Sequence, residues 1–275
     1  MGRLERTGKA GAANPLAFVI SEQDRQTLLM VDEALRTGRV RLAFQPVVLG
    51  ADPQRVAFYE GLLRVLDVGG RVIPARDFIG AVEMQETGRL LDCAALEIGL
   101  ATLARHPDVR IAVNMSARSI GYPRWQRTLT RGVQQSPTIA ERLILEITES
   151  SAVLVPEIVA AFMDDLQRTG ITFALDDFGA GYTAFRYFKD FFFDILKIDG
   201  QFIRNIHHDP DNQALTRALL SIARQFEMFT VAEAVETAEE AAFLQSIGVD
   251  CLQGYLFGAP SLRPAFMPDQ PRKRA

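Results

Sequence analysis

Residues 171–177 read Ile-Thr-Phe-Ala-Leu-Asp-Asp, an apolar run that ends on two adjacent carboxylates. Polar groups are costly inside an apolar strand unless they are paired or bind something. We interpret this stretch as a buried strand that carries Asp176 and Asp177 into a functional site at its carboxyl end. A lone carboxylate at a strand end usually caps the next helix, so the interpretation depends on whether other strands repeat the pattern.

Six further stretches show the same pattern, an apolar run that closes on a polar side chain. They are Ala57–Glu60, Arg110–Asn114, Leu143–Glu146, Phe193–Lys197, Phe229–Glu233 and Val249–Gln253. Segments of helical spacing lie between them, and strands that alternate with helices form a mostly parallel sheet with right-handed crossovers. An open doubly wound sheet would place its ligands at a single crevice, whereas a barrel gathers many strand ends on one rim. The repeated pattern therefore favours a barrel over seven separate helix caps.

One more strand, Arg41–Leu49, precedes these and is joined to Arg55–Leu63 by a short turn. A connection this short permits only antiparallel neighbours, because a parallel crossover needs a dozen residues or more. The sequence thus predicts an α/β fold, a TIM-like (β/α)8 barrel with an antiparallel first strand. We expect residues 1–20 to form a flexible leader, 21–265 a single barrel domain, and 266–275 a disordered tail.

Composition places limits on location and partners. The chain has 275 residues and a formal net charge of -4, which argues against binding of long nucleic acid. Its two cysteines, Cys93 and Cys251, lie inside apolar patterns and are interpreted as buried thiols in a reducing compartment. No apolar run approaches the ~20 residues that a spanning helix requires. We predict a cytoplasmic protein without membrane insertion.

The polar residues at five strand ends are hard oxygen donors, which suit Mg²⁺ or Mn²⁺ and not zinc. They are Glu60, Asn114, Glu146, Asp176 and Asp177. Four carboxylates at one rim of the barrel would repel one another strongly without cations, and one divalent ion neutralises only about two of them. The set therefore favours two metal ions, an arrangement that activates water and holds the oxygens of a phosphoryl displacement.

The remaining strand ends supply groups that could act on the water and the phosphate. Lys197 brings a fixed positive charge, suited to the attacking water or to the charge that develops on phosphorus. Glu233 is a candidate general base for the water proton. Gln253 and Glu236 would support the metal ligands or hold the water.

A series of short motifs runs in order from about Phe44 to Pro260. It comprises Gln45-Pro46, Tyr59–Arg64, Pro74 with Phe78-Ile79, Asn114-Met115-Ser116, Leu145–Glu149, Asp176–Tyr182, Leu196–Asp199, Ala232–Glu236 and Gln253-Gly254-Tyr255. In this order they resemble an EAL domain, the family of bacterial phosphodiesterases that linearise cyclic di-GMP. The resemblance implies a barrel with an antiparallel first strand, two Mg²⁺ or Mn²⁺ ions held by the oxygen donors above, and the linear dinucleotide pGpG as the product.

The resemblance gives the strand-end residues the roles proposed above and adds three residues. It implies that Glu149 stabilises the glycine-bearing loop after Asp177. It also implies that Gln45 and Arg64 contact the nucleotide. Five phenylalanines between residues 185 and 193 are more than a barrel exterior needs, and EAL domains pair through this neighbourhood. We therefore expect a homodimer through residues 182–193.

Two departures from the family pattern bear on activity. Gly61 stands where the family name gives alanine, which adds backbone freedom at a cost of roughly 0.5–1 kcal/mol in a strand. Ala234 replaces the usual glycine after Glu233, and a positive φ there would mis-aim Glu233. Two classes of function stay open: a working phosphodiesterase, and a catalytically weak or inactive EAL-like domain that binds cyclic di-GMP or a protein partner as a receptor. The complete ligand set favours the enzyme.

Overall fold

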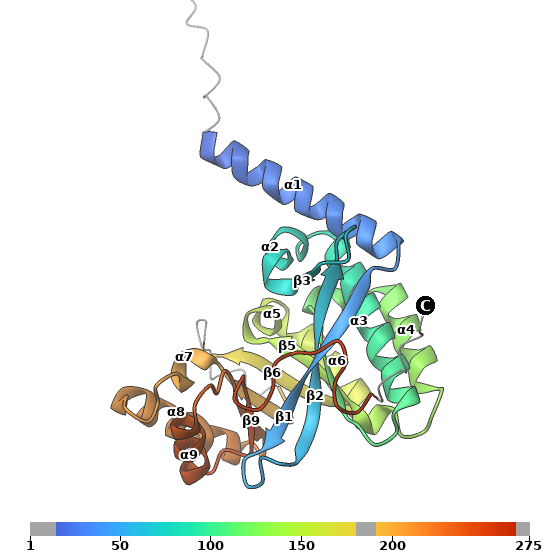
Figure 1. Ribbon diagram of the computed structural model, residues 1–275. Coiled ribbons are helices and arrows are strands. Elements are labelled where there is room, and N and C mark those ends of the chain that lie inside the picture. The colour runs from blue at the N-terminus through green and yellow to red at the C-terminus, as the bar shows by residue number, and fades with distance from the viewer. Residues whose placement is uncertain (1–14, 180–190, 268–275) are drawn as a thin grey trace, which may run out of the picture.

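The computed structural model describes residues 15–179 and 191–267 of the chain. Within these ranges, eight strands close into a barrel that helices surround (Figure 1). The barrel strands are β1 (Val40–Leu49), β2 (Val56–Leu66), β4 (Ile111–Asn114), β5 (Leu143–Thr148), β6 (Thr172–Phe178), β7 (Ile195–Ile198), β8 (Phe229–Ala232) and β9 (Cys251–Gln253). The predicted fold class is confirmed.

Strand β1 runs against the other seven of these barrel strands. It pairs antiparallel with β2, where Gln45 lies opposite Glu60, and antiparallel with β9 on its other side. From β2 through β4 to β9, the neighbouring barrel strands are parallel. The turn at residues 50–55 is too short for a crossover, which explains the reversed direction of β1.

Several short elements have no signature in the sequence. Strand β3 (Val72–Pro74) pairs antiparallel with the last residues of β2. Helices α5 (Glu149–Leu154) and α7 (Gly200–Ile203) directly follow strands and are too short to show helical periodicity. The longer helices are α1 (Pro15–Arg36), α3 (Glu86–Arg105), α4 (Pro123–Val133), α6 (Pro156–Gln167), α8 (Pro210–Gln225) and α9 (Ala238–Ile247), with the single turn α2 (Ile79–Val82) before α3. Most of the segment between the strands predicted to end at Asp177 and Lys197 lies outside the described residues.

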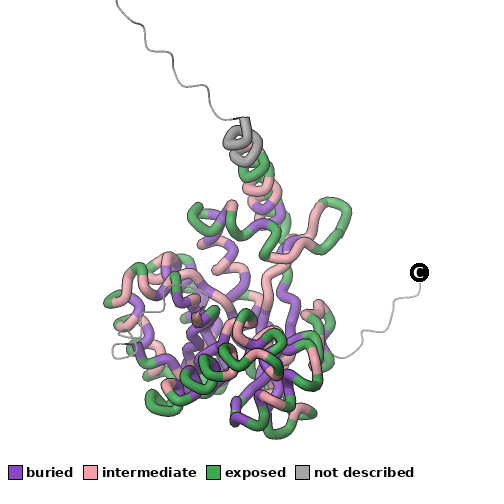
Figure 2. The backbone as a smooth tube through the Cα atoms, turned by 90° about the vertical axis from the view of Figure 1, so that its left-hand side faces the viewer, coloured by how far each residue is buried: buried purple, intermediate pink, exposed green. Residues whose placement is uncertain are grey.

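The barrel interior contains an apolar layer to which every barrel strand contributes one residue. The layer consists of Val47, Phe58, Ala112, Ile144, Ala174, Ile195, Val231 and Cys251. A larger apolar cluster lies between the strands and the surrounding helices, and it includes the fully buried Phe173 and Trp125. Figure 2 shows the buried positions concentrated along the strands and on the inner sides of the helices. Both cysteines are free and buried, as predicted.

Two predicted boundaries differ from the structure. Helix α1 begins at Pro15, inside the expected leader, because proline is well tolerated in the first turn of a helix. Its C-terminal part packs Val31 and Ala34 against the barrel domain, while its N-terminal part projects away (Figure 1). Phe266, assigned to the disordered tail, packs edge-on against Phe44 and Tyr59, since an aromatic ring gains by burial. No helix in the described part of the chain is long and apolar enough to span a membrane.

Candidate active site

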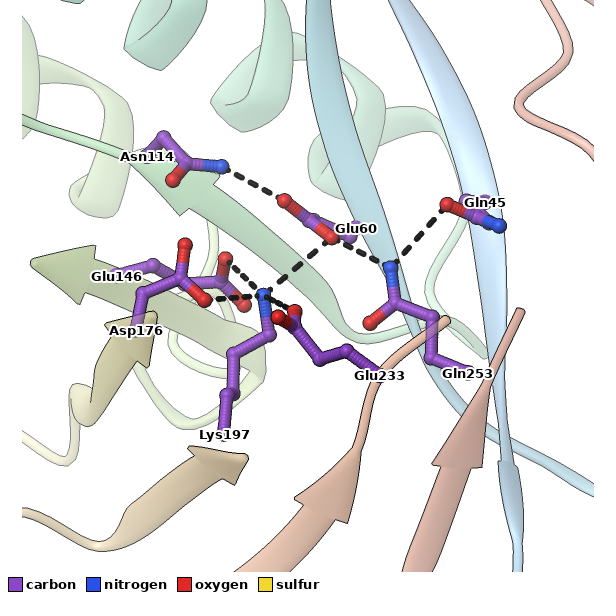
Figure 3. A network of polar contacts seen from close by, with 8 residues as sticks. All are labelled: Gln45, Glu60, Asn114, Glu146, Asp176, Lys197, Glu233 and Gln253. Carbon is purple, nitrogen blue, oxygen red and sulfur yellow. Dashed lines mark hydrogen bonds and ion pairs between the residues drawn. The ribbon is translucent and has the colours of Figure 1, made fainter. Parts of the chain in front are cut away.

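A polar layer lies directly above the apolar layer of the barrel. Its members are Gln45, Glu60, Asn114, Glu146, Asp176, Lys197, Glu233 and Gln253, one per strand or strand end (Figure 3). Each lies two residues along its strand from a member of the apolar layer. Because side chains alternate between the two faces of a strand, residues two apart point the same way. The eight polar side chains therefore face the barrel axis at the carboxyl ends of the parallel strands.

Lys197 occupies the centre of this layer. Its Nζ lies 2.8 Å from Asp176 Oδ1, 2.8 Å from Glu233 Oε1, 3.0 Å from Glu146 Oε2 and 3.4 Å from Glu60 Oε2. The Lys197 side chain is 1% exposed, so this charge is removed from water almost completely. One buried cation thus serves four carboxylates, which leaves an excess of negative charge (Figure 3).

The crowding shifts the pKa values of these groups in different directions. Burial acts to lower the pKa of Lys197, but the neighbouring carboxylates outweigh burial and hold its pKa well above the usual value. Burial raises the pKa of Glu146 well above its ordinary value, and it raises the pKa of Glu233 to about 8. Burial also acts on Glu60, but the charge of Lys197 and hydrogen bonds from two amides lower its pKa overall.

Side-chain amides fix the orientation of Glu60. Asn114 Nδ2 donates to Glu60 Oε1 at 2.8 Å, and Gln253 Nε2 donates to Glu60 Oε2 at 2.6 Å. Gln253 Nε2 also lies 3.2 Å from Gln45 Oε1, and Gln45 Nε2 donates to the carbonyl of Gly258 at 3.0 Å. These contacts place Gln45 beside the metal-ligand candidates as well as on the cavity wall.

The donor set fits divalent metal ions. Oxygens of Glu60, Glu146 and Asp176 lie within 4.8 Å of one another, and so do oxygens of Asp176, Asp177 and Glu233. Asp176 belongs to both groups, as expected for a ligand shared by two ions. Glu146 Oε1 and Asp176 Oδ1 are buried without a hydrogen-bond partner, although the latter is in ion-pair contact with Lys197. Buried carboxylate oxygens without donors are costly unless a cation satisfies them.

Two residues of the site adopt left-handed backbone conformations without being glycine. Asp177 has φ 54° and Ala234 has φ 53°. In this left-handed turn Asp177 keeps a carboxylate oxygen within 4.8 Å of Asp176, and burial together with the Asp176 charge raises the pKa of Asp177 to about 6. Position 234 thus does require a positive φ, and alanine adopts it. Glu233 nevertheless reaches Lys197, so the mis-aiming considered from the sequence is not seen.

A cavity of about 530 Å³ opens above the polar layer. Arg64, Arg76 and Arg204 line it, so the acidic floor is ringed by cations that suit a phosphate-containing ligand. Arg64 Nη1 donates to the carbonyl of Leu63 at 2.8 Å, and burial lowers the pKa of Arg64. Glu236 also lines the cavity but stands apart from the Lys197 network.

Glu149 lies behind the site and not in it. Its Oε2 accepts a hydrogen bond from the backbone N–H of Gly179 at 3.2 Å, so it contacts the loop that follows Asp177. The predicted dimer region, residues 182–193, falls mostly outside the described residues. Of its described phenylalanines, Phe191 and Phe193 are buried and Phe192 is 74% exposed.

Asp92 lies on the cavity wall, although no pattern in the sequence marked it. Its Oδ2 accepts hydrogen bonds from Ser119 Oγ at 2.6 Å and from the Ser116 N–H at 3.0 Å, and burial raises its pKa to about 6. Arg76 and Arg204 were missed as well. All three lie in helices or loops outside the barrel strands. The pattern of an apolar strand ending on a polar residue therefore does not include them.

The comparison with known families covers most of the chain. A family model described as "EAL domain" matches residues 29–260. The bifunctional diguanylate cyclase/cyclic di-GMP phosphodiesterase MucR of Pseudomonas aeruginosa is 30% identical over 246 residues, which are 87% of this chain and 36% of MucR. Cyclic di-GMP phosphodiesterase PdeF of Escherichia coli is 31% identical over 207 residues, 74% of this chain and 28% of PdeF. The chain spans about a third of the length of these curated relatives.

Solved structures agree with this match. A MucR phosphodiesterase in complex with c-di-GMP aligns with a TM-score of 0.74 at 30% identity, covering 87% of this chain and 98% of that structure. The FimX EAL domain from Pseudomonas aeruginosa bound to c-di-GMP aligns with a TM-score of 0.78 at 24% identity, covering 86% and 96%. The similarity to the FimX EAL domain concerns the fold alone, whereas the similarity to the MucR phosphodiesterase extends to the sequence.

Proposed function

We propose that this chain, which belongs to the EAL domain family, hydrolyses cyclic di-GMP to linear pGpG with the help of two Mg²⁺ or Mn²⁺ ions. The curated relatives named as cyclic di-GMP phosphodiesterases support a hydrolase at the level of the family. The observation that carries the proposal is the complete polar layer, which retains buried carboxylate oxygens without hydrogen-bond partners beneath an arginine-lined cavity.

The metal ions would be held by the five oxygen donors predicted from the strand ends. These are Glu60, Asn114, Glu146, Asp176 and Asp177, and Glu60 and Asp176 already lie in the acidic groups described above. When bound, the ions would neutralise the excess negative charge and polarise water and phosphate oxygens. In the proposed reaction the water oxygen forms a bond to phosphorus while the bond from phosphorus to one 3′ oxygen breaks, and that oxygen leaves as a hydroxyl group after taking up a proton from solvent.

The chain's own residues handle the proton and the developing charge. Burial raises the pKa of Glu233 to about 8 in the metal-free protein, and bound cations would lower it again and ionise the carboxylate. Glu233 Oε1 would then accept the proton of the attacking water. Lys197 stays protonated because its carboxylate neighbours raise its pKa. It would hold Glu233 in place and stabilise negative charge at the phosphate. Arg64, Gln45 and Glu236 on the cavity wall would position the nucleotide and the water.

A second candidate function is a receptor that binds cyclic di-GMP, or a protein partner, without turnover. One observation favours it: Ala234 holds a left-handed conformation in which an L-residue is strained, directly after the candidate base. If strain at Ala234 displaced Glu233 during the reaction, hydrolysis would be slow although cyclic di-GMP would still bind.

The test is turnover of cyclic di-GMP with Mg²⁺ or Mn²⁺, followed by chromatography of the products, beside a Glu60→Ala variant. Formation of pGpG that disappears in the variant supports the phosphodiesterase. Binding measured by calorimetry without product formation would favour the receptor. Absence of both would rule out both functions that use cyclic di-GMP.

The homodimer and the cytoplasmic location also stay predictions. The exposed Phe192 at the edge of the predicted contact region supports self-association. Analytical ultracentrifugation at micromolar concentration tests the dimer, and a monomeric mass would contradict it.

A further inference from the structure

Helix α7 lies against the loop that carries the candidate base. It begins at Gly200, three residues after Lys197, with Asp199 as its N-cap. A Cβ atom on residue 200 would come within 2.6 Å of the Cβ of Ala234 and 3.9 Å of the carbonyl oxygen of Glu233. Real Cβ atoms do not approach another carbon so closely, so this contact exists only because residue 200 is glycine.

The same loop is held from its other side by β9. Val235 N–H donates to the carbonyl of Gln253 at 2.9 Å. A Cβ on Gly254 would overlap the backbone of Val235, so the two chain segments lie in direct backbone contact. Residues 233–235 are therefore confined between α7 and the end of β9, and Ala234 keeps its left-handed φ of 53° inside this confinement.

Helix α7 also contacts the loop after the candidate metal ligands. Gln201 Nε2 donates to the carbonyl of Gly179 at 3.0 Å, and the ring of Phe202 lies where a side chain on Gly179 would be. A single helical turn thus touches both the loop that follows Asp177 and the loop that follows Glu233.

We infer that Gly200 and Ala234 form a steric pair that positions Glu233 against Lys197. The Cβ of Ala234 fits the space that Gly200 leaves open, and this contact fixes the left-handed turn and with it the direction of the Glu233 side chain. The catalytic role of this pair rests on the proposed phosphodiesterase function. The methyl group of Ala234 is thus accommodated because residue 200 has no side chain. Both act as positioning residues, because neither side chain reaches the reacting atoms.

The test is a double-mutant cycle of Gly200→Ala and Ala234→Gly. Gly200 has no positive φ and opens a helix, so alanine is conformationally allowed there and the substitution adds only the clash with Ala234. We expect kcat to fall about 10- to 100-fold with KM within about twofold, because a small misplacement of a catalytic group has this effect. The double variant leaves room for the added methyl group at position 200 and should return kcat to within about threefold of Ala234→Gly alone.

Gly80→Ala is the matched control, because a Cβ there meets nothing within 4 Å and its φ is not positive. The steric pair is contradicted if Gly200→Ala behaves like this control, or if the double variant does not recover. It is supported by loss and recovery of kcat while the thermal midpoint of every variant stays above the assay temperature.

Should the wild-type chain bind cyclic di-GMP without turning it over, the proposed function fails and the pair is judged from crystal structures. A Glu233–Lys197 ion pair, 2.8 Å in the wild-type chain, that lengthens in Gly200→Ala and returns in the double variant supports the pair. An ion pair that stays unchanged in Gly200→Ala overturns it.

Discussion

Two successive layers of the barrel interior are built on the same eight strands and have opposite chemistry. In the lower layer, Ile144 and its seven counterparts are apolar and pack against one another. Two residues away on each strand, Glu146 and its counterparts are polar, and four carboxylates share one lysine. Backbone geometry is common to both layers, so the difference lies in the side chains alone.

The barrel is therefore stabilised in one layer and loaded with unfavourable charge in the next. With all groups ionised, the four carboxylates and Lys197 leave a net charge of about −3 in a region that is mostly closed to water. Burial raises the pKa values of Glu146 and Glu233, and repulsion by neighbouring carboxylates adds to both shifts. Such a layer is tolerable if cations bind to it, and this is the physical argument for a metal centre.

The largest effect is expected from Lys197→Met, which removes the buried cation but keeps the volume. Turnover should fall at least ~1,000-fold, and the unfolding free energy of the metal-free protein should fall by about 3–5 kcal/mol, since buried carboxylates lose their partner. Product chromatography and urea unfolding measure the two effects. A loss of stability below about 1 kcal/mol would show that the carboxylates do not depend on this lysine.

A matched pair of variants on β5 separates the layers directly. Ile144→Ala should cost about 2–5 kcal/mol of unfolding free energy through the cavity it leaves, while the folded fraction keeps its turnover within about threefold. Glu146→Gln should do the reverse. It abolishes turnover but raises the stability of the metal-free protein by on the order of 1–4 kcal/mol, because burial and the neighbouring carboxylates disfavour the ionised carboxylate that the neutral amide replaces.

Equal activity losses in both variants, or equal losses of stability, would mean that the two layers are not separable. The experiment uses urea unfolding in the presence of a chelator and turnover in the presence of metal. Both variants lie on one strand two residues apart, so differences in local strand stability are controlled.

Metal binding should stabilise the folded protein through contacts with the polar layer alone. Adding Mg²⁺ or Mn²⁺ at about 100 times its dissociation constant should raise the unfolding free energy by about 2.7 kcal/mol. The shift should disappear in Asp176→Asn, because Asp176 belongs to both acidic groups. Thermal unfolding followed by calorimetry measures the shift, and Ile144→Ala serves as the control that retains it. An undiminished shift in Asp176→Asn would place the metal elsewhere.

The pH dependence of the metal-free protein should follow Glu233. Burial raises its pKa from 4.5 to about 8, so the folded state keeps a proton that the unfolded state loses. Stability from this group is therefore fully present below about pH 4.5 and is lost as pH rises through about 8. Between about pH 5 and 8, Glu233→Gln should flatten the decline by on the order of 4 kcal/mol. Urea unfolding at each pH checks the slope, and parallel curves for both proteins would contradict it.

The polar layer was predictable because its members share one local signal, an apolar strand that ends on a polar residue. That signal placed Glu60, Glu146 and Lys197 on one rim before any contact was known. The direction of β1 followed from the length of a turn. These features are encoded locally, by periodicity and by chain length between elements.

What could not be predicted depends on contacts between segments that are distant in sequence. Asp92 enters the cavity wall from a helix that carries no strand signal, and Phe266 packs on rings from β1 and β2. The sequence showed Ala234 as a departure, but not that Gly200 leaves room for its Cβ. Such pairings are products of packing, which composition and spacing do not determine.

The smallest effect is expected from Gly61→Ala, which restores the alanine of the family signature beside Glu60. An added Cβ would lie 3.0 Å from Leu42 Cδ1 and 3.2 Å from the carbonyl oxygen of Ala112, on the outer face of the barrel. The gain of roughly 0.5–1 kcal/mol from lower backbone freedom is offset by these tight contacts. We expect stability within about 0.5 kcal/mol of wild type and turnover within about twofold. A larger loss of turnover in a variant of unchanged stability to urea would show that packing on the outer face of β2 also controls the orientation of Glu60. The chemistry of the polar layer would then depend on contacts outside the barrel as well as on the two layers inside it.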